Sequence, residues 1–154
     1  MKLFGYILLM SFLFIPHKNY AQQNGAVFHS SHLKQKQNAP FSDAVEANGF
    51  LFLAGQIGFD YEQGAMINGG IKSETKQAIE NIKGVLVHHG LSLRDVIKCT
   101  VILKNIEDFA AFNEVYVNYF PNKPARTTFA AAGLARESLI EIECIALKSK
   151  KSEN

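Results

Sequence analysis

Two amphipathic helical patterns separated by an apolar strand pattern restrict this chain to an α+β fold. The first helix is expected to begin at Ser73, an N-cap residue type, and to end at Gly90, a residue type that commonly terminates helices. Its apolar residues recur at the spacing of one helix face: Ala78, Ile79, Ile82, Val85 and Leu86. The face they form must pack against another element.

The second helical pattern follows an apolar strand expected at residues 96–103. Asn105 is expected to cap this helix and Pro121 to end it, because proline disfavours helix at the residue before it. The apolar side of the helix contains Phe109, Phe112, Val115, Tyr116 and Tyr119. Two further strands are expected, from about residue 125 to 129 and from 139 to 147.

The pair Asn48-Gly49 predicts a β-hairpin, because these residue types readily take the two positive φ angles of a type I′ turn. It separates a strand in residues 42–47 from one in residues 50–56. Residues 57–72 contain four glycines and are expected to form a long loop. Residues 22–37 form a polar lead-in with one short strand near residues 26–28.

The order of these elements describes one α+β domain over residues 38–149, with two helices on one face of a mixed sheet. The other face also carries apolar side chains, which cannot stay bare in water. Self-association is therefore expected to cover that face. Residues 150–154 follow as a charged tail.

The charge balance argues against a nucleic-acid or membrane-surface partner. The chain of 154 residues has 16 Lys and Arg against 14 Asp and Glu, and Lys2 and Lys18 lie in the first 21 residues, which contain no acid. The remaining body thus has 14 basic and 14 acidic residues. Such a body lacks the one-signed field that attracts phosphate backbones or anionic lipids.

The start of the chain has the features of an export signal. Lys2 precedes an apolar core of about 13 residues, and the small residue Ala21 offers a possible cleavage site. The core is shorter than the roughly 20 residues that span a bilayer. Residues 1–21 are therefore interpreted as a cleaved signal, and the mature protein as periplasmic, without stable membrane association. An uncleaved membrane tether is the alternative, because Asn19 is not the small residue preferred three positions before a cut.

Cysteines and histidines give no strong signal. Cys99 and Cys144 lie in apolar runs, where buried free thiols are expected, although export leaves a disulfide between them open. His29 and His32 lie in the lead-in and are expected to be solvated. The adjacent histidines at 88 and 89 are expected to interact with carbonyls at a helix end. No metal site is expected.

Arg126 has the setting that most suggests a function. It opens a strand of small and apolar residues, where a buried guanidinium must be paired. Its planar fork can bind a substrate carboxylate through two hydrogen bonds. The residues alone favour the alternative, an internal ion pair with Glu141 or Glu143. These glutamates alternate with apolar residues and so share one sheet face, where one could position water or act as an acid or base.

Six motifs occur in an order similar to that of a known family. They are Gly55-Gln56-Ile57, the helical segment 74–83, the segment 101–105 at a strand end, Phe112-Asn113-x-x-Tyr116, Pro124-Ala125-Arg126 and Ile140-Glu141-Ile142-Glu143. Over about residues 38–149 the chain resembles the Rid family, also called YjgF.

The resemblance implies a chorismate-mutase-like fold that assembles as a homotrimer with clefts between subunits. It also implies a cofactor-independent enzyme that hydrolyses reactive 2-imino or 2-enamino acids, such as 2-aminoacrylate, to 2-keto acids and ammonia. Arg126 would clamp the carboxylate of this small substrate, and Glu141 would position the attacking water. Main-chain groups near Gly55 and Thr128 would hold the amino or imino group.

Three positions depart from the family pattern. Phe41, at the expected substrate site, stands where tyrosine is usual, so a phenolic hydroxyl is missing. Thr128 replaces a common cysteine, and Thr127 replaces a smaller residue. A non-catalytic trimeric module that binds small carboxylates or acts like a chaperone is therefore the alternative function. Endoribonuclease activity, ascribed to some members, comes third because the neutral body does not favour it.

Overall fold

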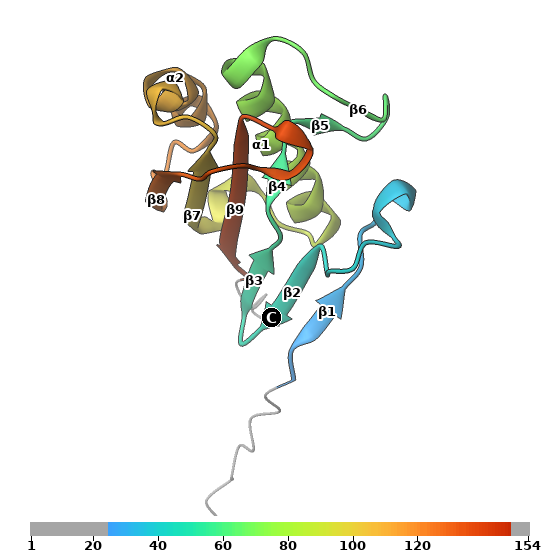
Figure 1. The fold of residues 1–154 in the computed structure, drawn as a ribbon. Helices are drawn as coiled ribbons and strands as arrows, with labels where there is room; N and C mark the ends of the chain where they lie inside the picture. The colour runs from blue at the N-terminus through green and yellow to red at the C-terminus, as the bar shows by residue number, and fades with distance from the viewer. Residues whose placement is uncertain (1–24, 149–154) are drawn as a thin grey trace, which may run out of the picture.

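The two helices and the long strands form in the order that the sequence patterns predict, with additional short strands between residues 56 and 66 (Figure 1). The computed structural model describes residues 25–148. Its strands are β1 (Val27–His29), β2 (Ala44–Ala47), β3 (Phe50–Leu53), β4 (Gln56–Ile57), β5 (Phe59–Asp60), β6 (Ala65–Met66), β7 (Val96–Leu103), β8 (Ala125–Ala130) and β9 (Ile140–Leu147). The α-helices are α1 (Gly70–His88) and α2 (Phe109–Tyr119), and short 3-10 turns lie at Lys34–Lys36, Leu93–Asp95, Ile106–Asp108 and Ala135–Glu137.

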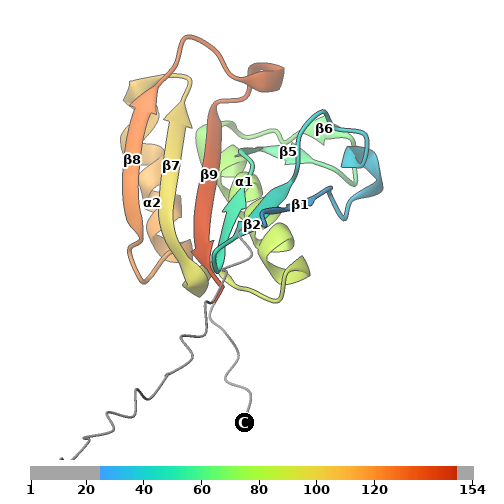
Figure 2. The same ribbon diagram turned by 90° about the horizontal axis from the view of Figure 1, so that it is seen from below.

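The main sheet is mixed and has the strand order β1-β2-β3-β9-β7-β8, with β4 also paired to β9. The paired strands are antiparallel except β7 and β8, which are parallel because α2 carries the chain back between them. Both helices lie on the same side of this sheet (Figure 2). The expected α+β class with two helices on one face is confirmed.

The Asn48-Gly49 hairpin is confirmed, with φ angles of 49° and 80° at the two turn residues. The expectation of a plain loop over residues 57–72 is wrong. Strands β5 and β6 pair there as a separate two-stranded sheet. The turn between them is stabilised by the Asp60 carboxylate, which accepts hydrogen bonds from the backbone N–H groups of Glu62 and Gln63.

Helix α1 begins earlier than expected, at Gly70, so the prediction of Ser73 as its N-cap is wrong. Gly69 occupies the cap position with φ 113°, a conformation that an L side chain rarely adopts. It lets the chain turn into the helix one turn earlier. The predicted stop at Gly90 is confirmed: this residue has φ 73°, and the next N–H, of Leu91, donates to the Leu86 carbonyl.

Helix α2 begins at Phe109 rather than directly after Asn105. Asn105 precedes the 3-10 turn Ile106–Asp108, and its side chain makes no capping hydrogen bond, so the predicted cap is wrong. The helix ends at Tyr119, two residues before Pro121, as the proline predicts.

The core lies between the sheet and the two helices, where alternate residues of β7 and β9 meet the apolar faces of α1 and α2. The open face of the sheet, formed by Phe52, Phe129, Ile145, Glu141 and Glu143, lacks such a cover within residues 25–148. Phe52 and Phe129 are 42% and 45% exposed. An exposed apolar sheet face of this kind is typical of a surface that associates.

Cys99 and Cys144 face each other across β7 and β9 as free, buried thiols, with their Sγ atoms 3.2 Å apart. No helix within residues 25–148 is both long and apolar enough to cross a membrane. The predicted export signal at 1–21 and the charged tail at 150–154 lie outside the described residues.

Candidate functional site

One cavity, which we call the Glu141 cavity, brings together three of the predicted site residues. It has a volume of about 560 Å³, and its lining includes Phe41, Gly55 and Glu141. Glu141 comes from β9 and lies opposite Ile57 of β4, so the pairing of these two strands sets its position. Aromatic side chains of Phe59 and Tyr61 complete much of the wall.

Gly55 is required for the position of Glu141. A Cβ atom at Gly55 would lie 2.8 Å from Cδ and 2.9 Å from Cγ of Glu141, and closer still to Oε1. Burial, and after it the charge of Glu143, raise the pKa of Glu141 above its ordinary value. A carboxylate in this state is a stronger proton acceptor than a solvated one, which suits it to activate water.

A buried ionic network lies beside this cavity, and sequence reasoning missed it. The ammonium group of Lys36 donates to the carboxylate of Asp43 and to Gln56 Oε1, at 3.3 Å for the latter. Ser31 Oγ donates to the other carboxylate oxygen of Asp43 at 2.9 Å. Lys36 is 8% exposed, although it lies in the polar lead-in. In the sequence, the acidic residue Asp43 directly before an apolar hairpin strand was the only indication of a buried ion pair here.

Arg126 lies in a second cavity, the Arg126 cavity, of about 370 Å³. Its Nη1 donates to Asn113 Oδ1 at 2.8 Å. Its guanidinium carbon lies 4.6 Å from the ring centre of Tyr116 and 5.1 Å from that of Phe112. Three side chains of helix α2 thus hold the arginine: Asn113 by a hydrogen bond, and Phe112 and Tyr116 by cation–π contacts.

The ion pair of Arg126 with Glu141 or Glu143, which the residues alone favoured, is wrong. Within residues 25–148 no salt bridge to Arg126 is present, and Asn113 supplies its hydrogen-bond partner. Asn113 was visible in the sequence only as part of a motif. This bond uses only Nη1, so the other N–H groups of the guanidinium can still bind a carboxylate in the open Arg126 cavity.

A single chain does not bring Arg126 and Glu141 together. Arg126 lies opposite Cys99 and faces the helices, whereas Glu141 lies opposite Ile102 and belongs to the open face. Thr128 is on the side of Arg126, and its buried Oγ1 has no hydrogen-bond partner within residues 25–148. The predicted site is therefore split into two halves on opposite sides of one sheet.

The four histidines of the described chain lie close together, which the sequence did not suggest. The rings of His29 and His89 are 4.6 Å apart, and those of His32 and His88 stack at 4.8 Å. These contacts form because β1 and the lead-in lie beside the end of α1. No group of three or more His, Cys, Asp or Glu residues in the described range is arranged to hold a metal ion.

Fold and cavities together define a small α+β protein of chorismate-mutase-like fold, with a carboxylate in one half-site and a guanidinium in the other. The sequence profile of the family described as Endoribonuclease L-PSP matches residues 32–148. The chain belongs to this family, which is also the YjgF or Rid family. The resemblance of the motifs is confirmed.

Named relatives and solved structures agree with this assignment. A RutC-family protein of Pyrococcus horikoshii is 50% identical over 114 residues, covering 73% of this chain and 90% of that protein. The 2-iminobutanoate/2-iminopropanoate deaminase of Homo sapiens is 40% identical over 110 residues, covering 71% and 80%. The crystal structure of E. coli TdcF with bound serine has a TM-score of 0.68 at 33% identity, covering 71% of this chain and 89% of TdcF. The E. coli YjgF gene product has a TM-score of 0.69 at 28% identity, covering 73% and 91%.

Proposed function

We propose that this protein hydrolyses reactive 2-imino and 2-enamino acids to 2-keto acids and ammonia, in clefts between subunits of a homotrimer. The observation that carries the proposal is the pair of half-sites: a preformed guanidinium in one cavity and a half-buried carboxylate in the other. Relatives that are named imine deaminases support the same chemistry.

The two half-sites explain why we propose an assembly. Arg126 and Glu141 belong to opposite sides of one sheet, so a substrate cannot contact both in a single chain. A cleft that joins the Glu141 cavity of one subunit to the Arg126 cavity of its neighbour would bring them together. It would also cover the exposed apolar sheet face with Phe52 and Phe129.

In this mechanism Arg126 binds the substrate carboxylate and so fixes the position of the adjacent C2 carbon. The carboxylate of Glu141 accepts a proton from water as the water oxygen attacks C2, the electron pair of the C=N bond moves to nitrogen, and Glu141 returns this proton to the nitrogen. The carbinolamine then collapses: the hydroxyl proton is transferred through Glu141 to the amino group, the C–N bond breaks, ammonia leaves, and the hydroxyl oxygen becomes the keto oxygen. An enamine first takes a proton from solvent at C3 to give the iminium ion, which loses a proton from nitrogen to give the imine. Main-chain groups near Gly55 and Thr128 orient the nitrogen.

The test generates imino acids in situ with an amino-acid oxidase and follows keto-acid release. We expect acceleration by the native protein, loss of it in Arg126→Ala and in Glu141→Gln, and full activity in the control Arg94→Ala, which changes an exposed arginine. No acceleration over a panel of imines would contradict the proposal. Thermal unfolding of each variant separates lost catalysis from lost folding.

Subunit mixing tests the shared site. Arg126→Ala and Glu141→Gln are each expected to be inactive, but co-expression should restore activity, because about a quarter of randomly formed clefts would take an intact Arg126 from one chain and an intact Glu141 from another. Light scattering should show a trimer. A monomer, or mixed assemblies without activity, would contradict the shared cleft.

A second candidate function is the trimeric binding module for small carboxylates. Phe41 favours it, since this wall of the Glu141 cavity offers no hydroxyl to substrate or water. Binding of a 2-keto acid without turnover would support it. Cleavage of RNA with steep salt dependence would instead support the nuclease activity in the family's description.

We also propose export to the periplasm. The signal-like composition of residues 1–21 supports it, with cleavage near Ala21. Fractionation and the mass of the mature chain test it: a product that begins at Gln22 supports cleavage, and a full-length product in the membrane fraction supports the tether.

A further inference from the structure

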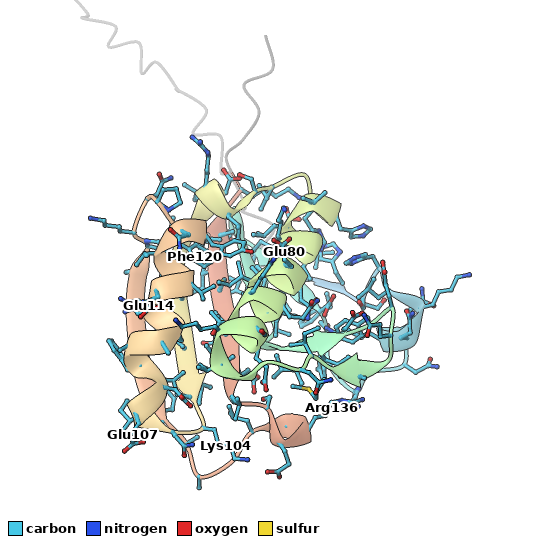
Figure 3. All side chains as sticks on the ribbon, turned by 90° about the horizontal axis from the view of Figure 1, so that it is seen from above. Glu80, Lys104, Glu107, Glu114, Phe120 and Arg136 are labelled. Carbon is cyan, nitrogen blue, oxygen red and sulfur yellow. The ribbon has the colours of Figure 1, made fainter. Side chains whose placement is uncertain are left out.

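Arg136 places a second guanidinium on the Glu141 cavity. Its guanidinium carbon lies 4.3 Å from the ring centre of Phe59, and this ring contacts Tyr61 edge-on at 5.0 Å. All three residues line the cavity. Figure 3 shows Arg136 beside the β5–β6 segment, away from helix α2.

The segment that carries Arg136 is attached to the rest of the domain on both sides. Arg136 and Glu137 both have positive φ angles, 55° and 57°, which non-glycine residues rarely adopt. On one side, Glu137 forms a salt bridge with Lys104 at 2.9 Å. On the other, the Leu139 N–H donates to the carboxylate of Glu74 at 2.8 Å. Backbone strain that the surroundings maintain in this way is typical of residues that a site needs in one orientation.

The charge of Arg136 is not neutralised by a carboxylate. Within residues 25–148 no salt bridge to it is present, and its described contact is the face of Phe59. The other cation of the cavity wall, Lys36, is paired with buried Asp43. Stacking on one face leaves the edge of the guanidinium, with its N–H donors, available to an anion.

The cavity is larger than the smallest substrates need. Its volume of about 560 Å³ lies within the range of pockets for much larger ligands. An imino acid of three or four carbons, held by the neighbouring subunit's guanidinium at one end, would leave the region near Phe59 and Tyr61 empty. A longer side chain would extend along these rings toward Arg136.

We propose that Arg136 binds a second anionic group at the far end of the substrate, so that the preferred substrates are imino acids with a carboxylate in the side chain. This inference rests on the proposed function, since it names the substrate class of the same site. Arg126 then binds the carboxylate next to the reacting carbon, Arg136 binds the distal carboxylate, and the rings of Phe59 and Tyr61 contact the methylene groups between them. Arg136 thereby determines specificity.

The test compares kcat/KM for imines of acidic amino acids with kcat/KM for imines of neutral ones, each generated by a suitable amino-acid oxidase. We expect the native protein to prefer the acidic imines and the ratio to fall at least tenfold in Arg136→Gln. Arg136→Lys should keep part of the preference, because it keeps the charge but not the fork. Arg94→Gln is the control and should keep the native ratio. Because both substrates meet the same preparation, partial misfolding cancels in the ratio. A native preference for neutral imines, or an unchanged ratio in Arg136→Gln, would overturn the proposal.

A binding measurement separates this inference from the proposed function. If no imine is turned over, calorimetry with a five-carbon 2-keto dicarboxylic acid and a four-carbon 2-keto monocarboxylic acid still tests the subsite. Tighter binding of the dicarboxylic acid, by at least tenfold and lost in Arg136→Gln, would support the subsite in a protein that only binds. Equal affinities would overturn it.

Discussion

Replacing Gly55 with alanine should disable Glu141 while leaving the fold intact. The added Cβ would lie 2.8 Å from Cδ of Glu141, and an ordinary contact needs at least 3.4 Å, so the carboxylate carbon must move by about 0.6 Å and the nearer oxygen by more. A carboxylate displacement of roughly 1 Å in an active site costs on the order of a hundredfold in rate. We therefore expect kcat/KM for imine hydrolysis to fall about a hundredfold in Gly55→Ala.

Stability should respond differently from activity. The atoms that the new Cβ meets belong to a flexible side chain, so Glu141 can rotate away, and the melting temperature of Gly55→Ala should stay near the native value. Gly58→Ala should instead lower the melting temperature. Its Cβ would lie 2.7 Å from the backbone Cα of Glu74, so helix α1 would have to move. Gly133→Ala is the matched control, since its Cβ meets no atom within 4 Å.

The assay is keto-acid release with all three variants at equal concentration, together with a crystal structure of Gly55→Ala. Native kcat/KM in Gly55→Ala, or a Glu141 carboxylate in its native place, would refute the argument. A large loss of activity in Gly133→Ala would show that the assay reports glycine replacement in general rather than the position of Glu141.

Three further predictions follow from charge and burial. Activity should fall as acid protonates Glu141, with a midpoint above its ordinary pKa, and Glu143→Gln should move this midpoint in the pH–rate profile to lower pH by removing a neighbouring charge. Burial, and after it the charge of His29, lowers the pKa of His89, so the unfolded state binds more protons than the folded state. The free energy of unfolding, measured in urea, should therefore drop as the pH falls below about 6.5. The drop should be smaller in His89→Gln. Lys36→Met should lower the free energy of unfolding by about 3–5 kcal/mol, because it leaves the buried carboxylate of Asp43 without its cation. The double variant Lys36→Met, Asp43→Leu should recover much of this loss. Equal stability of Lys36→Met and the native protein would contradict the buried pair.

Several charged groups surround the histidine cluster, including Asp43 and Lys36 beside His32. His89 faces His29, His88, Lys148 and Glu46, and the last of these is the group that favours protonation. His32 also has a pKa lowered by burial and then by its stacked neighbour His88. If unfolding free energy were constant between pH 7 and pH 5, the cluster would not be coupled to folding.

Local patterns in the sequence determined several elements because they depend on neighbours along the chain. The positive φ angles at Asn48 and Gly49 follow from their residue types, and the end of α1 at Gly90 follows in the same way. Strand alternation determined that Glu141 and Glu143 share one face, opposite Cys144. The family motifs determined the fold class. They also pointed to Arg126 and Glu141, which the structure places in two separate cavities.

Only the tertiary structure decided which side chains meet. Arg126 had two candidate carboxylate partners in the sequence, Glu141 and Glu143. The parallel pairing of β8 with β7 gave it Asn113 of α2 instead. The burial of Lys36 and the stacking of Arg136 on Phe59 likewise depend on segments far apart in the chain. Such contacts depend on strand register and on separations of a few Å, and no local periodicity encodes either of these. Turn and helix signals instead act between residues that are near in the chain, so the sequence shows them directly.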